Sequence, residues 1–274
     1  MSHSLRRGVR ISVRLVASQQ NAGDPLMLTK LVQLTDALRS KGGLHALVTW
    51  KPRSLASFRI VSSLLAEEVT FRTVIDGGAN VGQFARAAHW AFPTARFYCF
   101  EPQPDVCDKL RHNLSDLRSL KVFQSALGST DGEVEFHVNS FNQSSSVLRM
   151  LDKEGGIMAG TRETESLRVP CATLDALLAD EVVDAPALLK LDLQGFELEA
   201  LKGAPRILQL CSHVLVETVF SQAYHDEPLF QAVADYLGIA GFSFRRPLAF
   251  ARDRHGTICQ MDALFERSQP ESAE

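Results

Sequence analysis

The sequence predicts an α/β fold built on a mostly parallel sheet. From Arg72 onward, short apolar runs alternate with segments of helical periodicity, and strand–helix–strand alternation is typical of parallel βαβ units. Two of the apolar runs end in a glycine-containing turn that leads into a helix, at residues 76–82 and 192–197. The 274 residues are 45% hydrophobic and 22% charged, a composition that excludes fibrous, low-complexity and wholly disordered chains.

Each element follows from its local pattern. Asp24 and Pro25 are typical of a helix start, so we expect a helix over residues 24–41 and a second over 55–65. The expected strands are residues 73–75, 97–100, 122–126, 133–138, 187–192, 214–218, 242–245 and 258–265, and the expected helices are 84–90, 106–114, 173–178, 197–202 and 227–237. Asp131 and Gly132 form a turn that makes residues 133–138 half of a hairpin. Residues 139–164, which we call the lid segment, have no period and are predicted to form a long surface loop.

These elements divide the chain into three parts. Residues 1–68 form a basic arm and a helical extension, residues 69–266 the α/β domain, and residues 267–274 a disordered tail. The arm is acid-free but lacks a continuous apolar stretch, so we expect no secretory signal, and an organellar transit peptide is the alternative. Exposed faces of the extension could pair subunits in a homo-oligomer.

Composition limits the partners and the compartment. The 29 basic and 32 acidic residues give a net charge of −3, so no broad basic field is present to grip nucleic acid. No apolar run reaches the roughly 18 residues that a membrane span needs. Five scattered cysteines without a C-x-x-C motif predict neither a disulfide framework nor a zinc site. We therefore expect a cytoplasmic protein without a membrane span.

A glycine-rich turn follows the first apolar run. In residues 74–82, VIDGGANVG, Gly78 and Gly82 allow a tight turn, and the next helix begins with unpaired N–H groups. The dinucleotide fingerprint G-x-G-x-x-G is not matched, because Asn80 and Gln83 occupy glycine positions. Asp76 would repel a phosphate but pair with an ammonium group. The turn predicts a site for a cofactor with an amino-acid moiety; the alternative is an acidic strand end that caps a helix.

Acidic residues end three further strands. Glu101 follows residues 97–100, where nucleotide-binding sheets place an acid that accepts hydrogen bonds from ribose hydroxyls. Asp192 and Glu217 end two later strands, and the carboxyl ends of parallel strands meet at one edge. Paired carboxylates there could position or deprotonate an acceptor hydroxyl. In the alternative reading Lys190 pairs with one of these acids, and Glu197 only favours a helix N-terminus.

Four motifs, in this order, resemble the FkbM-type S-adenosylmethionine-dependent methyltransferases. They are DGGANVG at 76–82, FEPQP at 100–104, TLD at 173–175, and KLDLQGFE at 190–197 with LKGA at 201–204. The resemblance covers about residues 72–244. It implies a class I methyltransferase fold, a Rossmann-like sheet of seven strands with only the last antiparallel and helices on both faces. It also implies S-adenosylmethionine as cofactor and O-methylation as activity. Gln194 stands where many members have Glu, so we assign it no essential acid role.

The resemblance also implies residue roles. The methionine portion of the cofactor would lie along Asp76, Gly78, Asn80 and Gly82, the ribose at Glu101 and Pro102, and the adenine edge at Ser125 and Ala126. Asp192 would lie beside the transferred methyl group. The acceptor would be a hydroxyl of a glycan or small molecule that attacks this methyl group in line. We expect Asp192 to act as the base, with Glu217 as second choice.

Other polar residues carry weaker expectations. His225 follows Glu217 on a loop that could reach the substrate, whereas His213 is expected to be structural. The serines at 144–146 could offer hydroxyls from the lid segment, or only mark a flexible loop. No tight ligand spacing supports a metal.

Three other functions compete with this hypothesis. A dinucleotide-dependent oxidoreductase would share the acid after the second strand but needs three properly spaced glycines. A nucleic-acid amino-methyltransferase is disfavoured, because no Asn/Asp-Pro-Pro-aromatic turn follows the fourth strand. A degenerate, non-catalytic scaffold would bind no cofactor.

Overall fold

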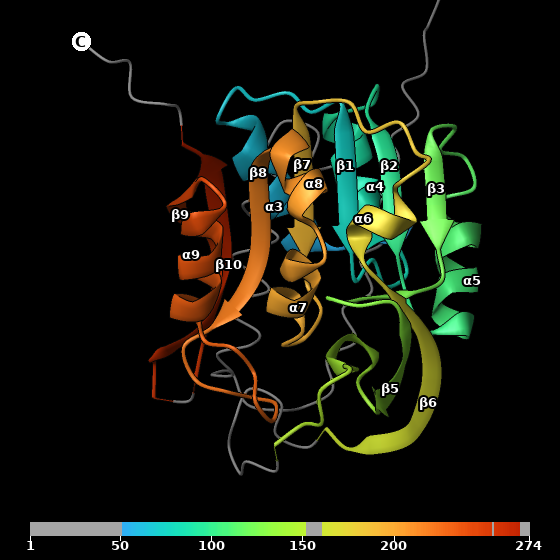
Figure 1. The fold of residues 1–274 in the computed structure, drawn as a ribbon, viewed down its shortest axis with the longest axis vertical. Coiled ribbons are helices and arrows are strands. Elements are labelled where there is room, and N and C mark those ends of the chain that lie inside the picture. The colour runs from blue at the N-terminus through green and yellow to red at the C-terminus, as the bar shows by residue number, and fades with distance from the viewer. Residues whose placement is uncertain (1–50, 152–160, 254, 269–274) are drawn as a thin grey trace, which may run out of the picture.

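The computed structural model describes residues 51–151, 161–253 and 255–268. Its main sheet has seven strands in the order β3-β2-β1-β7-β8-β10-β9 (Figure 1). Five strands are mutually parallel, namely β1 (Thr73–Gly77), β2 (Arg96–Phe100), β3 (Leu120–Phe123), β7 (Ala187–Leu191) and β8 (Cys211–Val219). β10 (Ile258–Arg267) is antiparallel to both β8 and β9 (Phe242–Arg252). The predicted seven-stranded class I sheet with an antiparallel last strand is confirmed.

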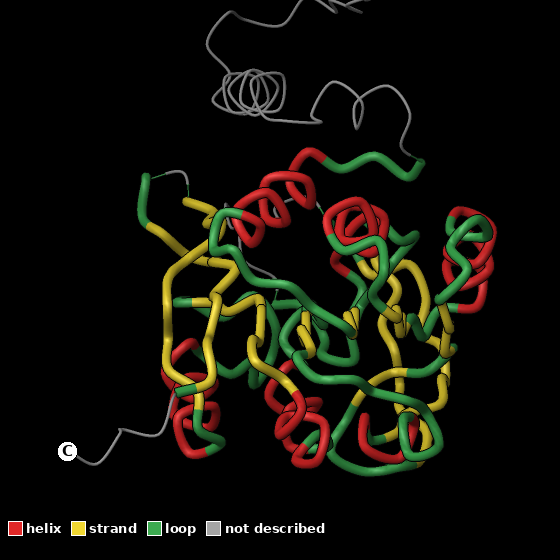
Figure 2. The backbone as a smooth tube through the Cα atoms, turned by 90° about the horizontal axis from the view of Figure 1, so that it is seen from above, coloured by secondary structure: helices red, strands yellow, loops and turns green. Residues whose placement is uncertain are grey.

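Helices cover both faces of this sheet (Figures 1 and 2). One face carries α3 (Leu55–Leu65), α4 (Gln83–Ala91) and α5 (Pro104–Asn113); the other carries α6 (Leu174–Leu177), α7 (Glu197–Lys202), α8 (Pro205–Leu210) and α9 (Phe230–Ile239). Neighbouring residues of a strand therefore point into different cores. Val74 packs in the first core and Ile75 in the second. Every residue of β1 and β7 is buried for this reason.

The helix predicted at residues 55–65 is present and belongs to the α/β core. It begins at Ser54, whose side chain accepts a hydrogen bond from the backbone N–H of Ser57. Phe58, Val61 and Leu64 are buried against the first face of the sheet. Residues 55–65, which we assigned to the helical extension, therefore share the core of the main domain. The basic arm and the helix expected at 24–41 lie outside the described residues.

A second, three-stranded sheet lies beyond the carboxyl ends of the main strands (Figure 1). Its order is β4 (Ala126–Leu127), β6 (Glu163–Ala172) and β5 (Gly132–Asn139). The prediction of a single strand at 122–126 is wrong, because β3 ends at Phe123 and β4 begins at Ala126. Between them, the Ser125 hydroxyl donates to the carbonyls of Ala126 and of Pro170 in β6, and β4 then pairs with β6.

The lid segment differs from the predicted surface loop. Its last residues begin β6, which is the antiparallel partner of β5, so the expected hairpin closes across the lid segment and not at the turn before β5. A short 3₁₀ turn, η1, spans Asn142–Ser144. Ser144 and Ser146 are fully buried, and the Ser146 hydroxyl donates to the carbonyl of Gln194. Residues 144–146 of the lid segment are therefore packed against the main domain.

The end of the domain also differs from the prediction by one residue. Arg267, which we placed in the tail, closes β10 because its guanidinium donates to the carbonyls of Cys211 and Leu208. All five cysteines are buried free thiols. No helix among the described residues is long and apolar enough to cross a membrane.

The packing of α3 predicts a large effect of one substitution. Leu64→Ala should lower the free energy of unfolding by about 2–5 kcal/mol, because the fully buried side chain leaves a cavity in the first core. Urea unfolding followed by circular dichroism measures this. The adjacent Leu65, 37% exposed, is the matched control, and Leu65→Ala should cost about 0.5 kcal/mol or less. Equal effects of both substitutions would contradict the placement of α3.

Candidate active site

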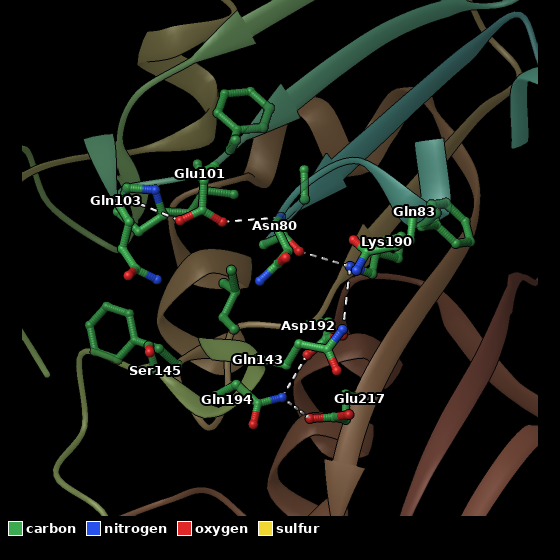
Figure 3. A pocket seen from close by; sticks show the side chains of 18 of the residues that line it. Asn80, Gln83, Glu101, Gln103, Gln143, Ser145, Lys190, Asp192, Gln194 and Glu217 are labelled. Carbon is green, nitrogen blue, oxygen red and sulfur yellow. Dashed lines mark hydrogen bonds and ion pairs between the residues drawn. The ribbon is translucent and has the colours of Figure 1, made fainter. Parts of the chain in front are cut away.

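A cavity of about 770 Å³ opens at the carboxyl ends of the main strands (Figure 3). It lies where β1 pairs with β2 on one side and β7 on the other, the place where open α/β sheets bind ligands. The first two turns of α3 and the lid segment complete its walls, with Ser57 and Ile60 from the helix and Phe141, Gln143 and Ser145 from the lid segment. A volume of this size is typical of small-molecule sites.

The turn after β1 shapes one wall. Gly78 has φ of 71°, and a Cβ there would lie only 1.9 Å from the carbonyl oxygen of Asp192, so the turn packs directly on the end of β7. Gly78 and Asn80 line the cavity. Gly82, also left-handed at φ of 95°, does not line the cavity: a Cβ there would meet Leu110 of α5 and Leu114 just after that helix. Gly82 therefore shapes the turn without facing the cavity.

Glu101 presents a fixed carboxylate at the end of β2. Its two oxygens accept the backbone N–H groups of Asn80 and Gln103, each at 3.0 Å. Burial raises the pKa of Glu101 to about 7, although these two hydrogen bonds lower it. Each oxygen keeps a further lone pair, and Glu101 and Pro102 both line the cavity. Glu101 can accept hydrogen bonds from ligand hydroxyls.

Asp76 does not reach the cavity. It is fully buried, and its Oδ1 lies 3.0 Å from the Lys190 ammonium. The same ammonium donates to the carbonyls of Gly77 and Gly78, at 3.3 and 3.2 Å. Burial alone would lower the pKa of Lys190, but the carboxylates of Asp76 and Asp192 raise it overall. The alternative in which Lys190 pairs with Asp192 or Glu217 holds only for the longer contact with Asp192, at 3.8 Å, and the nearer partner is Asp76. Asp76 does not line the cavity.

The amide of Gln194 bridges two of the predicted acids (Figure 3). Its Nε2 donates to Asp192 Oδ1 and to Glu217 Oε2, both at 2.7 Å. The two carboxylates hold the amide with its nitrogen toward them. The buried Tyr224 hydroxyl lies 2.9 Å from Gln194 Oε1 and 2.8 Å from the Ser144 carbonyl oxygen, and its one hydrogen serves these two acceptors. A Glu at this position would place three carboxylates together, so the amide explains how Asp192 and Glu217 can be close.

Three carboxylates form a row across neighbouring strands. Asp192 follows β7, Glu217 belongs to β8, and Asp262 of β10 is directly opposite Glu217 in the antiparallel register. Burial raises the pKa of Asp262 to about 7, with a further contribution from Asp192. Burial, Asp192 and Asp262 raise the pKa of Glu217 well above its ordinary value. All three carboxylates line the cavity, and we call them the acidic row.

Glu197 closes the turn before α7. Its carboxylate accepts the backbone N–H groups of Leu193 and Gly195, and burial raises its pKa to about 7. It therefore serves the helix N-terminus, as the alternative interpretation proposed.

The remaining candidates divide into two groups. Ser125 and Ala126 line the cavity near Phe100. His225 is exposed, and its backbone N–H donates to the carbonyl of Arg149, so the structure does not bring it to the cavity. His213 is buried edge-on against a phenylalanine ring, as expected for a structural residue. Within the described ranges, no group of three or more His, Cys, Asp or Glu side chains is arranged to hold a metal ion.

Sequence reasoning missed Asp262 and Gln260. Both lie in the apolar run 258–265, where polar residues alternate with buried ones. This alternation was visible, but only the pairing of β10 with β8 shows that these two residues face Glu217.

The fold and the cavity define a class I S-adenosylmethionine-dependent methyltransferase. The chain belongs to the FkbM methyltransferase family, because the sequence model of the family described as methyltransferase FkbM domain matches residues 76–244, more than half of the chain. The resemblance drawn from the four motifs is thereby confirmed.

The chain is similar in sequence to three proteins that are named methyltransferases. The chain is 24% identical to 2-O-methyltransferase NoeI of Sinorhizobium fredii, over 75% of this chain and 84% of the relative. It is 28% identical to hexuronic acid methyltransferase AglP of Haloferax volcanii, over 61% of this chain and 65% of the relative. It is 30% identical to methyltransferase sdnD of Sordaria araneosa, over 53% of this chain and 65% of the relative.

The contact between Asp76 and Lys190 makes a testable prediction. Lys190→Met should lower the free energy of unfolding by about 3–5 kcal/mol, because it leaves the fully buried Asp76 carboxylate without a counter-charge. Urea unfolding measures this, and adding Asp76→Asn should recover part of the loss. Lys202→Met, at an exposed ion pair, is the control and should cost about 0.5 kcal/mol. A double variant as unstable as Lys190→Met would contradict the pairing.

Proposed function

We propose that this protein transfers the methyl group of S-adenosylmethionine to a hydroxyl oxygen of an uncharged glycan or small molecule. One observation carries the proposal: a single cavity has the fixed Glu101 carboxylate on one side, at the end of β2, and the acidic row of β7, β8 and β10 on the other. The names of NoeI and AglP support a sugar as acceptor, whereas the acidic row argues against an acidic sugar of the kind that the name of AglP gives.

The residues at the β1 and β2 ends fit the donor. Glu101 would accept the ribose hydroxyls, because its orientation is fixed by two backbone N–H groups. Ser125 and Ala126 would face the adenine edge, and Gly78 and Asn80 the amino-acid end. Asp76 would act there only through Lys190, which neutralises it. When bound, S-adenosylmethionine supplies a methyl group that its sulfonium centre has already activated.

The protein then has to align the acceptor and exclude water. Ser57 and Ile60 of α3 and Phe141 of the lid segment would hold the acceptor over the acidic row, which converts an encounter into an oriented reaction. The five buried free thiols support a reducing, cytoplasmic location. The net charge of −3 supports an acceptor other than nucleic acid.

Donor binding should depend on pH through Glu101. Below about pH 7 the Glu101 carboxyl holds a proton, which competes with the ribose hydroxyls for its oxygens. The affinity for S-adenosylhomocysteine should therefore rise about tenfold from pH 6 to pH 8, measured by calorimetry. Glu101→Gln should weaken binding and remove the pH dependence. Glu133→Gln, at an exposed position of β5, should change neither the affinity nor its pH dependence. Absence of binding in the unmodified protein would exclude the proposed function.

The acidic row should select neutral acceptors. With tritiated S-adenosylmethionine, we expect methyl transfer to members of a panel of methyl hexosides and at least tenfold less to the matching methyl hexuronides, because like charges repel at this range. Raising the salt concentration should narrow this gap only slightly, since the row is half-buried. Better transfer to the hexuronides would contradict an uncharged acceptor.

A further inference from the structure

One acidic residue at the cavity lies outside the recognised motifs and is well placed to take the acceptor proton. We propose that Asp262 of β10 is this base, and that it binds the acceptor hydroxyl and receives its proton. The inference rests on the proposed function and identifies the third member of the acidic row as the catalytic one. It differs from the sequence-based expectation, which favoured Asp192 and then Glu217.

Glu217 is already engaged on both oxygens. Oε2 accepts a hydrogen from the Gln194 amide at 2.7 Å, and Oε1 accepts one from the Gln260 amide. Each oxygen keeps a further lone pair, but both are already held by protein amides, whereas no described group holds the oxygens of Asp262. Glu217 therefore serves to hold the two amides in place.

Asp192 is also held by the protein. Its Oδ1 accepts the other hydrogen of the Gln194 amide at 2.7 Å, and its Oδ2 lies 3.8 Å from the Lys190 ammonium. Both oxygens of Asp192 therefore already face groups of the protein. Asp192 is thus suited to attract and orient a substrate group more than to take its proton.

Asp262 differs from Glu217 and Asp192, because it has neither an amide hydrogen bond nor an ion pair with Lys190 among the described contacts. Within the described residues, its side chain makes no hydrogen bond or ion pair, although it is half-buried and lines the cavity. On β9 the residue opposite is Ala249, which is uncharged, and on β8 it is Glu217. Side chains directly opposite on antiparallel strands lie close together. The carboxylate of Asp262 therefore lies in the same row as the two held carboxylates, and its oxygens can accept a hydrogen bond from an acceptor hydroxyl.

The charges around Asp262 suit this role. Burial and the Asp192 carboxylate raise its pKa, and the Lys190 ammonium lowers it, which leaves the pKa at about 7. Glu217, from β8, adds a further carboxyl. A base with a pKa near the working pH combines a useful ionised fraction with a strong pull on the proton.

The transfer balances with these groups alone. The acceptor O–H bond breaks, its proton goes to a carboxylate oxygen of Asp262, and its electron pair enters the new bond between the acceptor oxygen and the methyl carbon. The electron pair of the broken carbon–sulfur bond stays on sulfur. Asp262 then releases the proton to water before the next turnover.

The test compares two carboxylates of the same strand. Asp262→Asn should lower kcat for a methyl hexoside roughly 10²-fold to 10⁴-fold, with the affinity for S-adenosylhomocysteine unchanged. Glu266→Gln, four residues along β10 at an exposed ion pair, is the matched control and should leave both quantities unchanged. Asp262→Asn also removes a like charge opposite Glu217, so its melting temperature should not fall.

The pH profile separates catalysis from a structural role. In the unmodified protein kcat should rise with pH and level off above about 7, as the Asp262 carboxyl loses its proton. Asp262→Asn should lose this rise, and Asp262→Glu, which keeps a carboxylate, should restore part of it. An Asp262→Asn variant with the rate and pH profile of Glu266→Gln would overturn the proposal while leaving methyl transfer itself established.

A second readout does not depend on turnover. In protein labelled with carbon-13 at the aspartate carboxyl groups and saturated with S-adenosylhomocysteine, one resonance should titrate near pH 7 and be absent in Asp262→Asn. This measurement decides the proposal even if no methyl hexoside is an acceptor. Titration of that carboxyl at the ordinary aspartate pKa near 4 would overturn the role of Asp262 at neutral pH. Failure of S-adenosylhomocysteine to bind would instead overturn the proposed function.

Discussion

The contact between the Lys190 ammonium and the fully buried Asp76 carboxylate holds the cavity together. One ammonium group meets a carboxylate of β1, two carbonyls of the turn after β1, and, at 3.8 Å, the carboxylate that follows β7. A charge buried at the junction of two strands is tolerated only with a partner and hydrogen bonds. Lys190 supplies both, and in doing so fixes the distance between the donor half of the cavity and Asp192.

The acceptor half solves a different electrostatic problem. Three carboxyl groups stand in one row, and like charges on neighbouring strands repel. The Gln194 amide donates hydrogen bonds to Asp192 and Glu217, and the Gln260 amide donates one to Glu217, which offsets this repulsion. The Tyr224 hydroxyl contacts the amide oxygen of Gln194, whose nitrogen points to the two carboxylates. The third carboxyl is left to the substrate. A polar residue without acid or base chemistry of its own thereby decides which acid can react.

Local patterns were sufficient for most of the fold. The helices at 55–65 and 197–202 begin and end where apolar spacing and the glycine at 203 place them, and the order of motifs indicates the sheet. Patterns failed where a side chain redirects the chain, as Ser125 does between β3 and β4. A period-2 or period-3.6 signal contains no information about such a turn.

The site was predictable to the extent that strand ends define it. Glu101, Asp192 and Glu217 lie in the cavity because each ends or nearly ends a parallel strand. Asp76 also ends such a strand, yet its side chain contacts Lys190 and not the cavity. The sequence alone could not predict this, because it does not show which of two nearby acids a buried lysine contacts. Asp262 lies mid-strand on an antiparallel partner, so only the register of β10 against β8 brings it to the others.

The walls of the cavity come from different stretches of the chain. The donor half is built from residues within 76–244, the segment that the family shares, whereas Ser57 and Ile60 precede that segment and Gln260 and Asp262 follow it. In the proposed division of the cavity, substitutions at Ser57, Ile60 or Asp262 would therefore reshape the acceptor side without touching the residues proposed to hold the donor. The two flanks of the family segment thus offer positions at which acceptor preference could be redesigned around an unchanged donor site.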